Sequence, residues 1–466
     1  MERVTGRVLT VSAEALPLPT WPDGHWCGEV ALFIREAAAK NLSVLERGGT
    51  LGTLASLLSH VIRFSWVNKI SLVKFDNDVF TKFMESLSVE KVYVQGELQE
   101  KRGGSQCQKI GKLTLNFLEF VGKLHRVDMV SERGPNIRAE RRVSVAKGKH
   151  QAPGLARAYW YHASFPKKSG KKKRFLISLD YINKLRRAAA KLKAKPFVKQ
   201  RLLVTIQLLE SFGARNVELV RLKTKDILAA IEDKTRYVRI FNAKRRTGSE
   251  VDRTRFVKIS ASDLQFFKTY ISIYRAPLVR KKLGAEADHG FMLVSWRTGR
   301  PLAAGTLTAD LRRLRVAAGI KGKAHPHLFR HRYVTLKLLE LIKAHNLTDK
   351  TGFKANFKIP AFAREVAEST GHTSIASLET YIDWAFVLLR TSSGARKEVD
   401  LGELLKSAVS AKSVLEAKRK ILSDKEFGDE VLLILQAVIA EINQVDTAAK
   451  DAAGAQTIDD ILGQMS

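Results

Sequence analysis

Four short segments and one tyrosine carry side chains that suit chemistry on a phosphate ester. The segments are Gly213-Ala-Arg-Asn-Val-Glu-Leu219, Asn242-Ala-Lys-Arg-Arg-Thr-Gly248, Pro326-His-Leu-Phe-Arg-His331 and Gly371-His-Thr-Ser-Ile375, and the tyrosine is Tyr381. Guanidinium groups bind phosphate oxygens through two parallel hydrogen bonds and stay charged at neutral pH. Preorganised cations can stabilise the negative charge that develops when a phosphoryl group is transferred to a hydroxyl.

Each of these residues, taken alone, also fits a purely structural role. Arg215 suits a salt bridge with a residue such as Glu218, and His372 suits a helix cap or a core position. A His-x-x-Arg pair occurs by chance in many proteins, and a lone tyrosine on a helix usually belongs to a core or a surface. The joint occurrence of the segments in one order along the chain favours a common site.

In content, order and local spacing, these segments resemble the tyrosine recombinases, also called phage-type integrases. The first segment matches the family's arginine motif, in which Arg is followed by Glu-Leu, and the third matches its His-x-x-Arg motif. The fourth matches its Gly-His motif, with Tyr381 nine positions after His372. The resemblance extends over residues 195–389 and, more loosely, over the preceding helical region, which looks like the family's core-binding domain.

The resemblance implies that Tyr381 is the nucleophile in a DNA strand transfer, forming a 3′-phosphotyrosyl bond and freeing a 5′-hydroxyl. It implies that Arg215, Arg330 and His372 bind the phosphate. His327 is expected to assist proton transfer or to hold the phosphate. The energy of the broken bond is retained for rejoining, so no ATP, metal or other cofactor is implied.

The resemblance also assigns a general acid to a lysine in the loop between two predicted strands, and Lys244 is our choice. The neighbouring Arg245 and Arg246 leave the register open by a position or two. An arginine would be a poor acid because its pKa is high. Glu218 is expected to support the site rather than to react.

The sequence departs from the family pattern in two places. Position 329 is Phe where Leu is more usual, which is a mild apolar exchange. The stretch from Arg330 to His372 is longer than the family's compact form and contains Lys350, Lys354 and Lys358. We interpret this stretch as an insertion.

The charge of the chain points to a polyanionic partner. The 466 residues include 80 Lys and Arg against 47 Asp and Glu, a formal net charge of +33. Such an excess repels itself unless a polyanion is bound, so DNA or RNA is the first expectation. Charge alone leaves open another kind of basic protein, such as a ribosome-associated factor or a membrane-surface binder.

Several other classes of protein find no support in the sequence. With only Cys27 and Cys107 we expect neither a disulfide framework nor structural zinc, which fits a reducing cytoplasm. No Walker-type phosphate loop, GxGxxG after a strand or HExxH motif occurs. The N-terminal residues lack the apolar segment of a signal peptide, and no stretch reaches the ~18 apolar residues of a membrane span. We expect a soluble, cytoplasmic protein with no membrane contact and no metal.

Apolar periodicity predicts a mainly α fold with a small antiparallel β-sheet, an α+β arrangement of a helical core-binding domain and a tyrosine-recombinase catalytic domain. The two strands are expected at Tyr237–Phe241 and Thr254–Ile259, on either side of the loop that contains Lys244. Helical spacing recurs over residues 51–66, 80–87, 110–124, 202–209, 262–280, 306–318, 328–343, 360–369 and 375–389.

We expect four regions along the chain. Residues 1–130 form the N-terminal helical, DNA-binding domain, of which the first ~45 are an extension. Residues 131–194 are a basic interdomain linker, residues 195–395 the catalytic domain, and residues 396–466 a helical, locally acidic extension. Because DNA repels acidic side chains, the last region is expected to contact protein, within the subunit or between subunits.

The basic linker supplies candidate DNA contacts, although a solvated or disordered segment is an equal interpretation of a charge run. The three aromatic residues 159–161 suit either base stacking or local packing. The candidate DNA-binding cations in the linker and the strand loop are Lys167, Lys168, Lys171, Lys172, Lys173, Arg174, Arg245 and Arg246.

The main hypothesis is a site-specific recombinase acting on double-stranded DNA as a tetramer, in integration or excision, as for a mobile element. A partner recombinase or accessory protein is left open. Alternatives are a type IB topoisomerase or telomere resolvase with the same chemistry, and a catalytically inactive, architectural DNA-binding relative. An RNA-binding or ribosome-associated protein would not need the ordered motifs.

Overall fold

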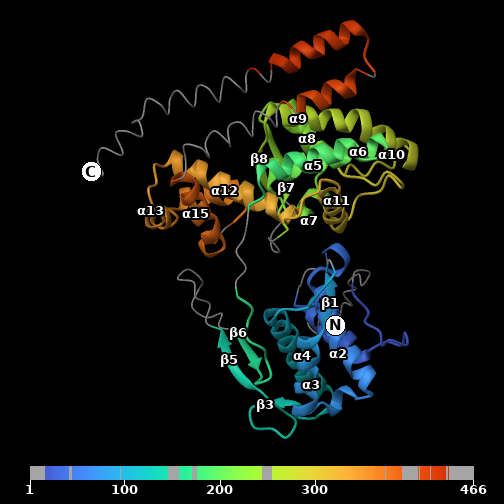
Figure 1. Cartoon of the computed structure of the whole chain (residues 1–466), viewed down its shortest axis with the longest axis vertical. Coiled ribbons are helices and arrows are strands. Elements are labelled where there is room, and N and C mark those ends of the chain that lie inside the picture. The colour runs from blue at the N-terminus through green and yellow to red at the C-terminus, as the bar shows by residue number, and fades with distance from the viewer. Residues whose placement is uncertain are drawn as a thin grey trace, which may run out of the picture. The chain divides into compact units, whose positions relative to one another are not determined.

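The computed structural model divides the chain into two units, residues 1–173 and 174–466, which are described separately. The described residues are 16–40, 45–94, 96–144, 157–170, 176–243, 254–372, 374–390, 408, 410–419, 421–436 and 439. Both units are mainly helical with small two-stranded sheets (Figure 1). The predicted fold class is therefore confirmed.

The α-helices in the described residues of the first unit are α1 (Gly28–Ala39), α2 (Leu45–Asn68), α3 (Asn77–Val89) and α4 (Gly104–His125). Helix α3 is capped by Asp76, whose Oδ1 accepts the backbone N–H of Val79 at 2.8 Å. Phe80 and Phe83 on α3 and Phe117 on α4 are fully buried in one apolar core with residues of α1 and α2. Both cysteines, Cys27 and Cys107, are buried in this core.

Small two-stranded sheets complete the described part of the first unit. Strands β1 (Lys91–Val94) and β2 (Glu97–Glu100) pair antiparallel, and β3 (Val130–Ser131) pairs parallel with β4 (Ile137–Arg138). Strands β5 (Glu140–Ser144) and β6 (Arg157–Tyr161) form an antiparallel ladder that packs on α4.

The aromatic residues of β6 pack within the first unit. Trp160 is buried and donates its indole N–H to Glu119 of α4 at 2.8 Å. Arg141 lies over the Trp160 ring, and Arg142 lies 3.4 Å from the centre of the Tyr161 ring. Cation–π contacts of this kind hold the two strands together. Of the two interpretations of residues 159–161, base stacking and local packing, the contacts of β6 therefore match local packing.

The boundary between the units falls inside residues 131–194, the segment that we expected to be a linker. Its described residues are largely folded: β4, β5 and β6 belong to the first unit, and α5 (Leu179–Lys191) belongs to the second. The many charged residues of this segment favoured the linker interpretation, and the strands that its aromatic residues anchor were not predicted.

The second unit contains the motif segments. Its first helices are α5, α6 (Pro196–Phe212), α7 (Asn216–Val220) and α8 (Thr224–Glu232). Strands β7 (Tyr237–Phe241) and β8 (Thr254–Lys258) then pair antiparallel, as predicted, with Tyr237 opposite Lys258. The later elements are α9 (Ala261–Thr269), η2 (Tyr270–Arg275), α10 (Ala276–Leu283), α11 (Ala304–Ala317), α12 (Pro326–Ala344), α13 (Lys350–Asn356), α14 (Pro360–Thr370) and α15 (Ile375–Arg390).

The single helix expected over residues 262–280 is interrupted by a π-helical turn, η2. Pro277 follows this turn at the start of α10 and has no backbone N–H to donate, which favours a widened turn. Arg275, at the end of η2, is buried and forms a bidentate ion pair with Asp288 at 2.5 Å.

The insertion between Arg330 and His372 folds back onto the helix that carries Tyr381. Phe353 on α13 is fully buried in a cluster that also contains Phe362 of α14 and Tyr381 of α15. Lys350 forms an ion pair with Asp383, and Lys354 forms one with Glu379 at 3.6 Å. Helix α13 therefore packs beside α15 (Figure 1).

The described part of the C-terminal region packs on the second unit. Two helical stretches, residues 410–418 and 424–436, supply Val414 and Ile434 to its core cluster. Lys418 and Glu430 form an ion pair between the two stretches. We expected this region to contact protein either within the subunit or between subunits. The structure contains a contact within the subunit.

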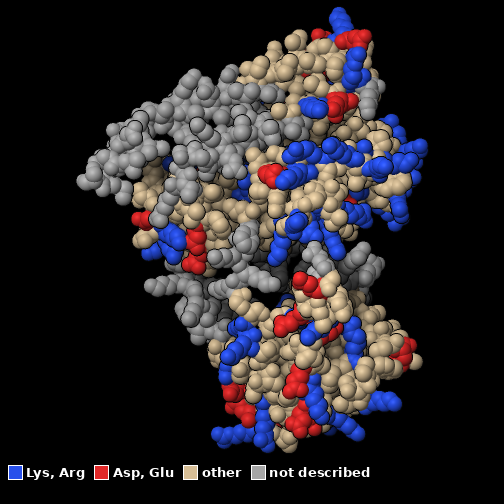
Figure 2. Space-filling model, viewed as in Figure 1, with Lys and Arg blue, Asp and Glu red and all other residues tan. Residues whose placement is uncertain are grey.

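Lys and Arg side chains gather on the visible face of the second unit over α5, α6 and α10 (Figure 2). Part of this cluster comes from Arg280, Lys281 and Lys282 in the last turn of α10. Within the described ranges, no helix has the length and apolar character needed to cross a membrane.

Candidate active site

Arg330 lies at the centre of the motif residues. It is 2% exposed on α12 and donates from Nη1 to the carbonyl of Gly213 at 2.7 Å and from Nη2 to the carbonyl of Thr370 at 3.1 Å. The same Nη2 lies 3.4 Å from Nε2 of His372. One guanidinium therefore joins the loop that carries Arg215 to the loop that carries His372.

Arg330 is charged at neutral pH in spite of its burial. Desolvation, and then the nearby charge of Arg215, lower the pKa of Arg330 to about 10. Glu218 and Tyr381 act in the opposite direction. Two positive groups are held close together here, so this place suits a bound anion.

Glu218 positions Arg215 and reaches the strand loop. Its carboxylate is buried and lies 2.6 Å from Nη1 of Arg215, and it accepts the Arg215 backbone N–H at 3.0 Å. It also accepts the N–H of Ala243, at the end of β7, at 3.4 Å. The salt bridge that would explain Arg215 alone is present, and it also ties Arg215 to the position next to Lys244.

Tyr381 faces a histidine pair on α12. Its hydroxyl lies 2.8 Å from Nδ1 of His331, and both side chains are buried. The rings of His331 and His327 are 4.3 Å apart, and His327 is exposed. The ring of His372 lies 5.7 Å from the Tyr381 ring. Thus Tyr381, His372 and Arg330 are brought together, with His327 at the exposed edge.

His331 is a residue that our sequence reasoning quoted in a motif but gave no role. It directly follows the His-x-x-Arg sequence. Considering every residue of that segment, and not only the motif positions, would have made His331 a candidate site residue. No comparable signal exists for Arg255 on β8, which only the structure brings to the site.

Arg255 contacts both the loop that carries Arg215 and the loop that carries His372. It is buried on β8, donates to the carbonyl of Phe212 at 3.2 Å, and its Nε would lie 3.2 Å from a Cβ added to Gly371. Desolvation is the largest effect on its pKa, which it lowers. Gly213 has a φ of +51°, and a Cβ there would overlap the ring of Tyr333. The two glycines therefore allow close packing on either side of Arg330.

Not all predicted residues can be placed. Lys244, Arg245 and Arg246 lie outside the described residues, as do Lys171, Lys172, Lys173 and Arg174. Lys167 and Lys168 are described and exposed near the end of the first unit. Their predicted contacts with DNA stay predictions.

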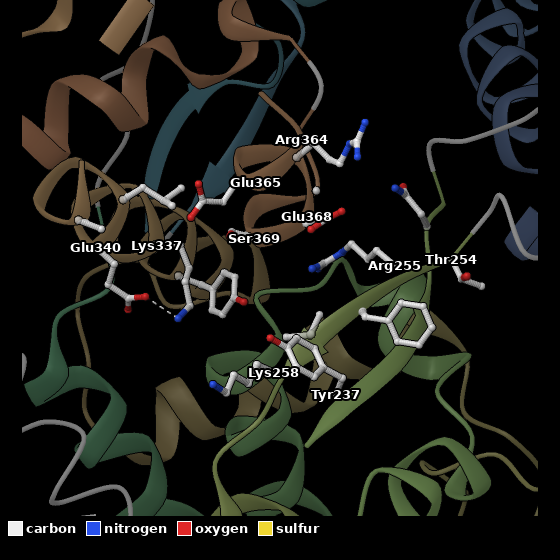
Figure 3. A pocket seen from close by; sticks show the side chains of 18 residues that line it. Tyr237, Thr254, Arg255, Lys258, Lys337, Glu340, Arg364, Glu365, Glu368 and Ser369 are labelled. Atoms are coloured by element: carbon white, nitrogen blue, oxygen red, sulfur yellow. Dashed lines mark hydrogen bonds and ion pairs between the residues drawn. The ribbon is translucent and has the colours of Figure 1, made fainter. Parts of the chain in front are cut away.

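A pocket of about 700 Å³ lies beside the motif residues, between the β7–β8 sheet and helices α12 and α14 (Figure 3). Arg255 and Gly371 line it, together with Tyr333. Its walls mix cations such as Lys258 with carboxylates such as Glu368. Tyr381 is not part of this lining, so the pocket is a neighbour of the candidate site rather than the site itself.

Within the described part of the chain, no group of three or more His, Cys, Asp or Glu side chains is placed to hold a metal ion. The polar groups around Arg330 are donors and imidazoles with a single buried carboxylate, Glu218, which already accepts from Arg215. This donor set matches an anion better than a cation.

Comparison with known proteins finds a family match within the second unit. The model of the phage integrase family matches residues 178–341. The tyrosine recombinase XerC of Ralstonia pickettii (strain 12J) is 24% identical over 180 residues, which is 39% of this chain and 48% of that protein. The chain thus aligns with about half the length of this curated relative.

Two solved recombinase structures are also similar. The XerH site-specific recombinase bound to a palindromic difH substrate, a post-cleavage complex, is 17% identical, with 76% of this chain and 81% of that chain covered and a TM-score of 0.43. A lambda integrase(75-356) dimer bound to a COC′ core site is 15% identical, with 70% and 95% covered and a TM-score of 0.40.

Residues 178–341 thus match the phage integrase family, and the chain is similar to a tyrosine recombinase. The family match includes Arg215, Glu218, His327 and Arg330 and ends at residue 341, inside the stretch between Arg330 and His372. His372 and Tyr381 are joined to the matched part by the contacts with Arg330 and His331.

Proposed function

We propose that this protein is a site-specific DNA recombinase that cleaves and rejoins DNA strands through a 3′-phosphotyrosyl bond to Tyr381. The observation that carries the proposal is the meeting of Arg330, His372 and Tyr381 around one point, with Arg215 held nearby by Glu218. The match of residues 178–341 to the phage integrase family and the similarity to a tyrosine recombinase support it.

The proposed reaction uses the site's cations to stabilise charge. Arg215, Arg330 and His372 donate hydrogen bonds to the non-bridging oxygens of the scissile phosphate, where negative charge increases in the transition state. Fixed donors of this kind typically contribute about 10²–10³ in rate each. The Tyr381 oxygen forms the new bond to phosphorus, and the 5′ oxygen of the cleaved strand leaves.

The leaving 5′ oxygen takes a proton from Lys244, with His327 assisting at the exposed edge of the site. The backbone N–H of Ala243, the residue before Lys244 in the chain, donates to Glu218, which also accepts from Arg215. Rejoining reverses these steps: the 5′-hydroxyl attacks phosphorus, and the Tyr381 oxygen leaves. One phosphodiester is exchanged for another, so the chemistry balances without ATP.

Double-stranded DNA is the proposed partner. The net charge of +33 suits a polyanion, and the related XerH and lambda integrase structures are described as bound to their DNA sites. We propose that subunits assemble on DNA as a tetramer, as the family resemblance implies. Lys167 and Lys168, both exposed, are candidate phosphate contacts in the first unit.

The test is formation of a covalent adduct. A DNA site is first selected from a random-sequence duplex library with Tyr381→Phe, and a nicked duplex carrying that site is then incubated with wild type and variant. An adduct that resists denaturant, forms without metal and is absent for Tyr381→Phe is the expected result. Specific binding with no adduct from either protein would favour an architectural role. An adduct with Tyr381→Phe would exclude Tyr381 as the nucleophile.

A further inference from the structure

The Tyr381 hydroxyl lies against a histidine that the family's motif positions do not include. Nδ1 of His331 is 2.8 Å from this hydroxyl, and the two ring centres are 5.3 Å apart with an interplanar angle of 40°. Tyr381 is 4% exposed and His331 is 5% exposed. The contact joins α12 to α15, two helices that pack along one another.

A buried phenol needs a nearby proton acceptor before it can attack phosphorus. The ordinary pKa of tyrosine is about 10, so the hydroxyl is protonated at neutral pH. Water has little access to a side chain that is 4% exposed. An imidazole has an ordinary pKa of about 6.5 and is the side chain best suited to accept a proton under these conditions.

Geometry separates the two histidines of α12. His331 directly contacts the hydroxyl that would react, whereas the neighbouring His327 is exposed, on the side from which DNA would reach the site. This division matches two different proton transfers. One is the loss of the phenolic proton, and the other occurs at the leaving 5′ oxygen.

We propose that His331 is the general base for Tyr381, an inference that rests on the proposed recombinase function. As the bond from the Tyr381 oxygen to phosphorus forms, the phenolic proton moves to Nδ1 of His331, and the bond from phosphorus to the 5′ oxygen breaks. The leaving oxygen is protonated by Lys244. On rejoining, the 5′-hydroxyl attacks, and the Tyr381 oxygen takes its proton back from His331.

The charges around His331 are compatible with this role only when DNA is bound. Protonated His331 would lie near Arg330 on its own helix and near His372 from the loop before α15, and these groups disfavour a further cation. The scissile phosphate supplies the opposing negative charge. Transfer of the proton is therefore coupled to substrate binding.

His331→Asn separates proton transfer from simple orientation. The amide group of Asn stands close to the position of Nδ1 and can keep a hydrogen bond to the Tyr381 hydroxyl, but it does not take up a proton. If His331 acts as a base, adduct formation slows by about a hundredfold or more in the variant. If it only orients Tyr381, the variant retains most of the wild-type rate.

A substrate with sulfur in place of the bridging 5′ oxygen identifies which proton transfer is lost. A thiol has an ordinary pKa of about 8.5 and leaves without needing an acid. We would measure adduct formation on nicked duplexes of the selected site, with oxygen or sulfur at that position, for wild type, His331→Asn and Lys244→Ala. Melting temperature and gel-shift affinity for the same duplex show whether each variant folds and binds.

The inference requires that His331→Asn is slow on both substrates while Lys244→Ala recovers on the sulfur substrate. A His331→Asn defect that disappears with sulfur would assign His331 to the leaving group and overturn the inference, as would a near wild-type rate on both substrates. In either case the proposed function stands. No adduct from wild type on the sulfur substrate would overturn the proposed function and this inference with it. If His331→Asn fails to fold, His331→Gln is measured in its place.

Discussion

Nη2 of Arg330 lies 3.4 Å from Nε2 of His372, and the same nitrogen donates to the carbonyl of Thr370, two residues earlier. The guanidinium thus both holds the His372 loop in place and stands beside the side chain with which it would bind phosphate. The Arg330 guanidinium therefore has both a structural role and a proposed catalytic role.

Arg330→Lys is expected to separate these two roles. Lysine keeps the charge but cannot reach the carbonyls of Gly213 and Thr370 together, because its donors sit on a single nitrogen. We expect adduct formation to fall by about 10²-fold or more, with a measurable loss of thermal stability. Arg332→Lys on the same helix is the matched control. An Arg330→Lys rate within a few-fold of wild type would contradict the proposed role.

Gly213→Ala is expected to displace the Arg215 loop. The residue has a φ of +51°, and an added Cβ would overlap the Tyr333 ring. Gly319→Ala is the control, because Gly319 has a φ of +63° but no atom within 4 Å of an added Cβ. Both variants bear a left-handed backbone cost of about 1 kcal/mol. Only Gly213→Ala should lose a further 1–3 kcal/mol, roughly, and most of its cleavage rate. Equal melting temperatures would show that Tyr333 moves aside easily.

Phe353→Ala tests whether the insertion stabilises the helix of Tyr381. Phe353 is fully buried among the side chains of α12, α14 and α15, so its loss should cost about 3 kcal/mol in the free energy of unfolding. Lys350→Ala removes an ion pair whose two side chains are each about half exposed, and should cost less than about 1 kcal/mol. Urea denaturation measures both, and a larger effect for Lys350→Ala would contradict the packing argument.

Asp288→Asn tests the ion pair between the buried Arg275 and Asp288 at the π-helical turn. Hydrogen bonds from Arg275 are the main reason that the pKa of Asp288 falls to about 2 in the folded protein. A depressed carboxyl pKa contributes stability that is present above the ordinary value of about 3.8 and is lost as the pH falls toward 2. The melting temperatures of wild type and variant should therefore differ most at neutral pH and converge between pH 4 and pH 2. A constant difference over that range would contradict the assignment.

Lys167→Ala/Lys168→Ala tests a DNA contact in the first unit. If both lysines contact phosphates, the double variant should lower the slope of log affinity against log salt by roughly two. Lys40→Ala/Lys123→Ala is the control, since these exposed lysines already pair with Glu36 and Glu119. Equal slopes for the two double variants would remove Lys167 and Lys168 from the DNA contacts.

The parts of the fold that could be predicted from the sequence are those with a strong local signal. The helices around Phe80, Leu115 and Leu338 show apolar residues at helical spacing, and all three side chains are buried. The β7–β8 pair alternates buried and exposed residues. The π-helical turn and the β5–β6 hairpin were not predicted, because Pro277 acts through a missing donor and Trp160 is anchored by Glu119 far away in sequence.

The candidate site shows the same division. Arg215, Arg330, His372 and Tyr381 lie in short motifs, so residue type and order were enough to predict that they meet. Arg255 could not be predicted, since its contact with the Phe212 carbonyl joins β8 to the last residue of α6, far away in sequence. His331 was within a quoted segment, but only the position of α15 shows that its ring meets the Tyr381 hydroxyl.

The burial of both cysteines has a practical use. Cys27 and Cys107 are the chain's two cysteines, and burial raises the pKa of Cys27 to about 11, so little thiolate is present at neutral pH. A single cysteine introduced at the exposed Lys354 would therefore react preferentially with a maleimide dye. Because Lys354 pairs with Glu379, two residues before Tyr381, the fluorescence of that dye would follow the nucleophile's helix in real time while DNA is cut and resealed.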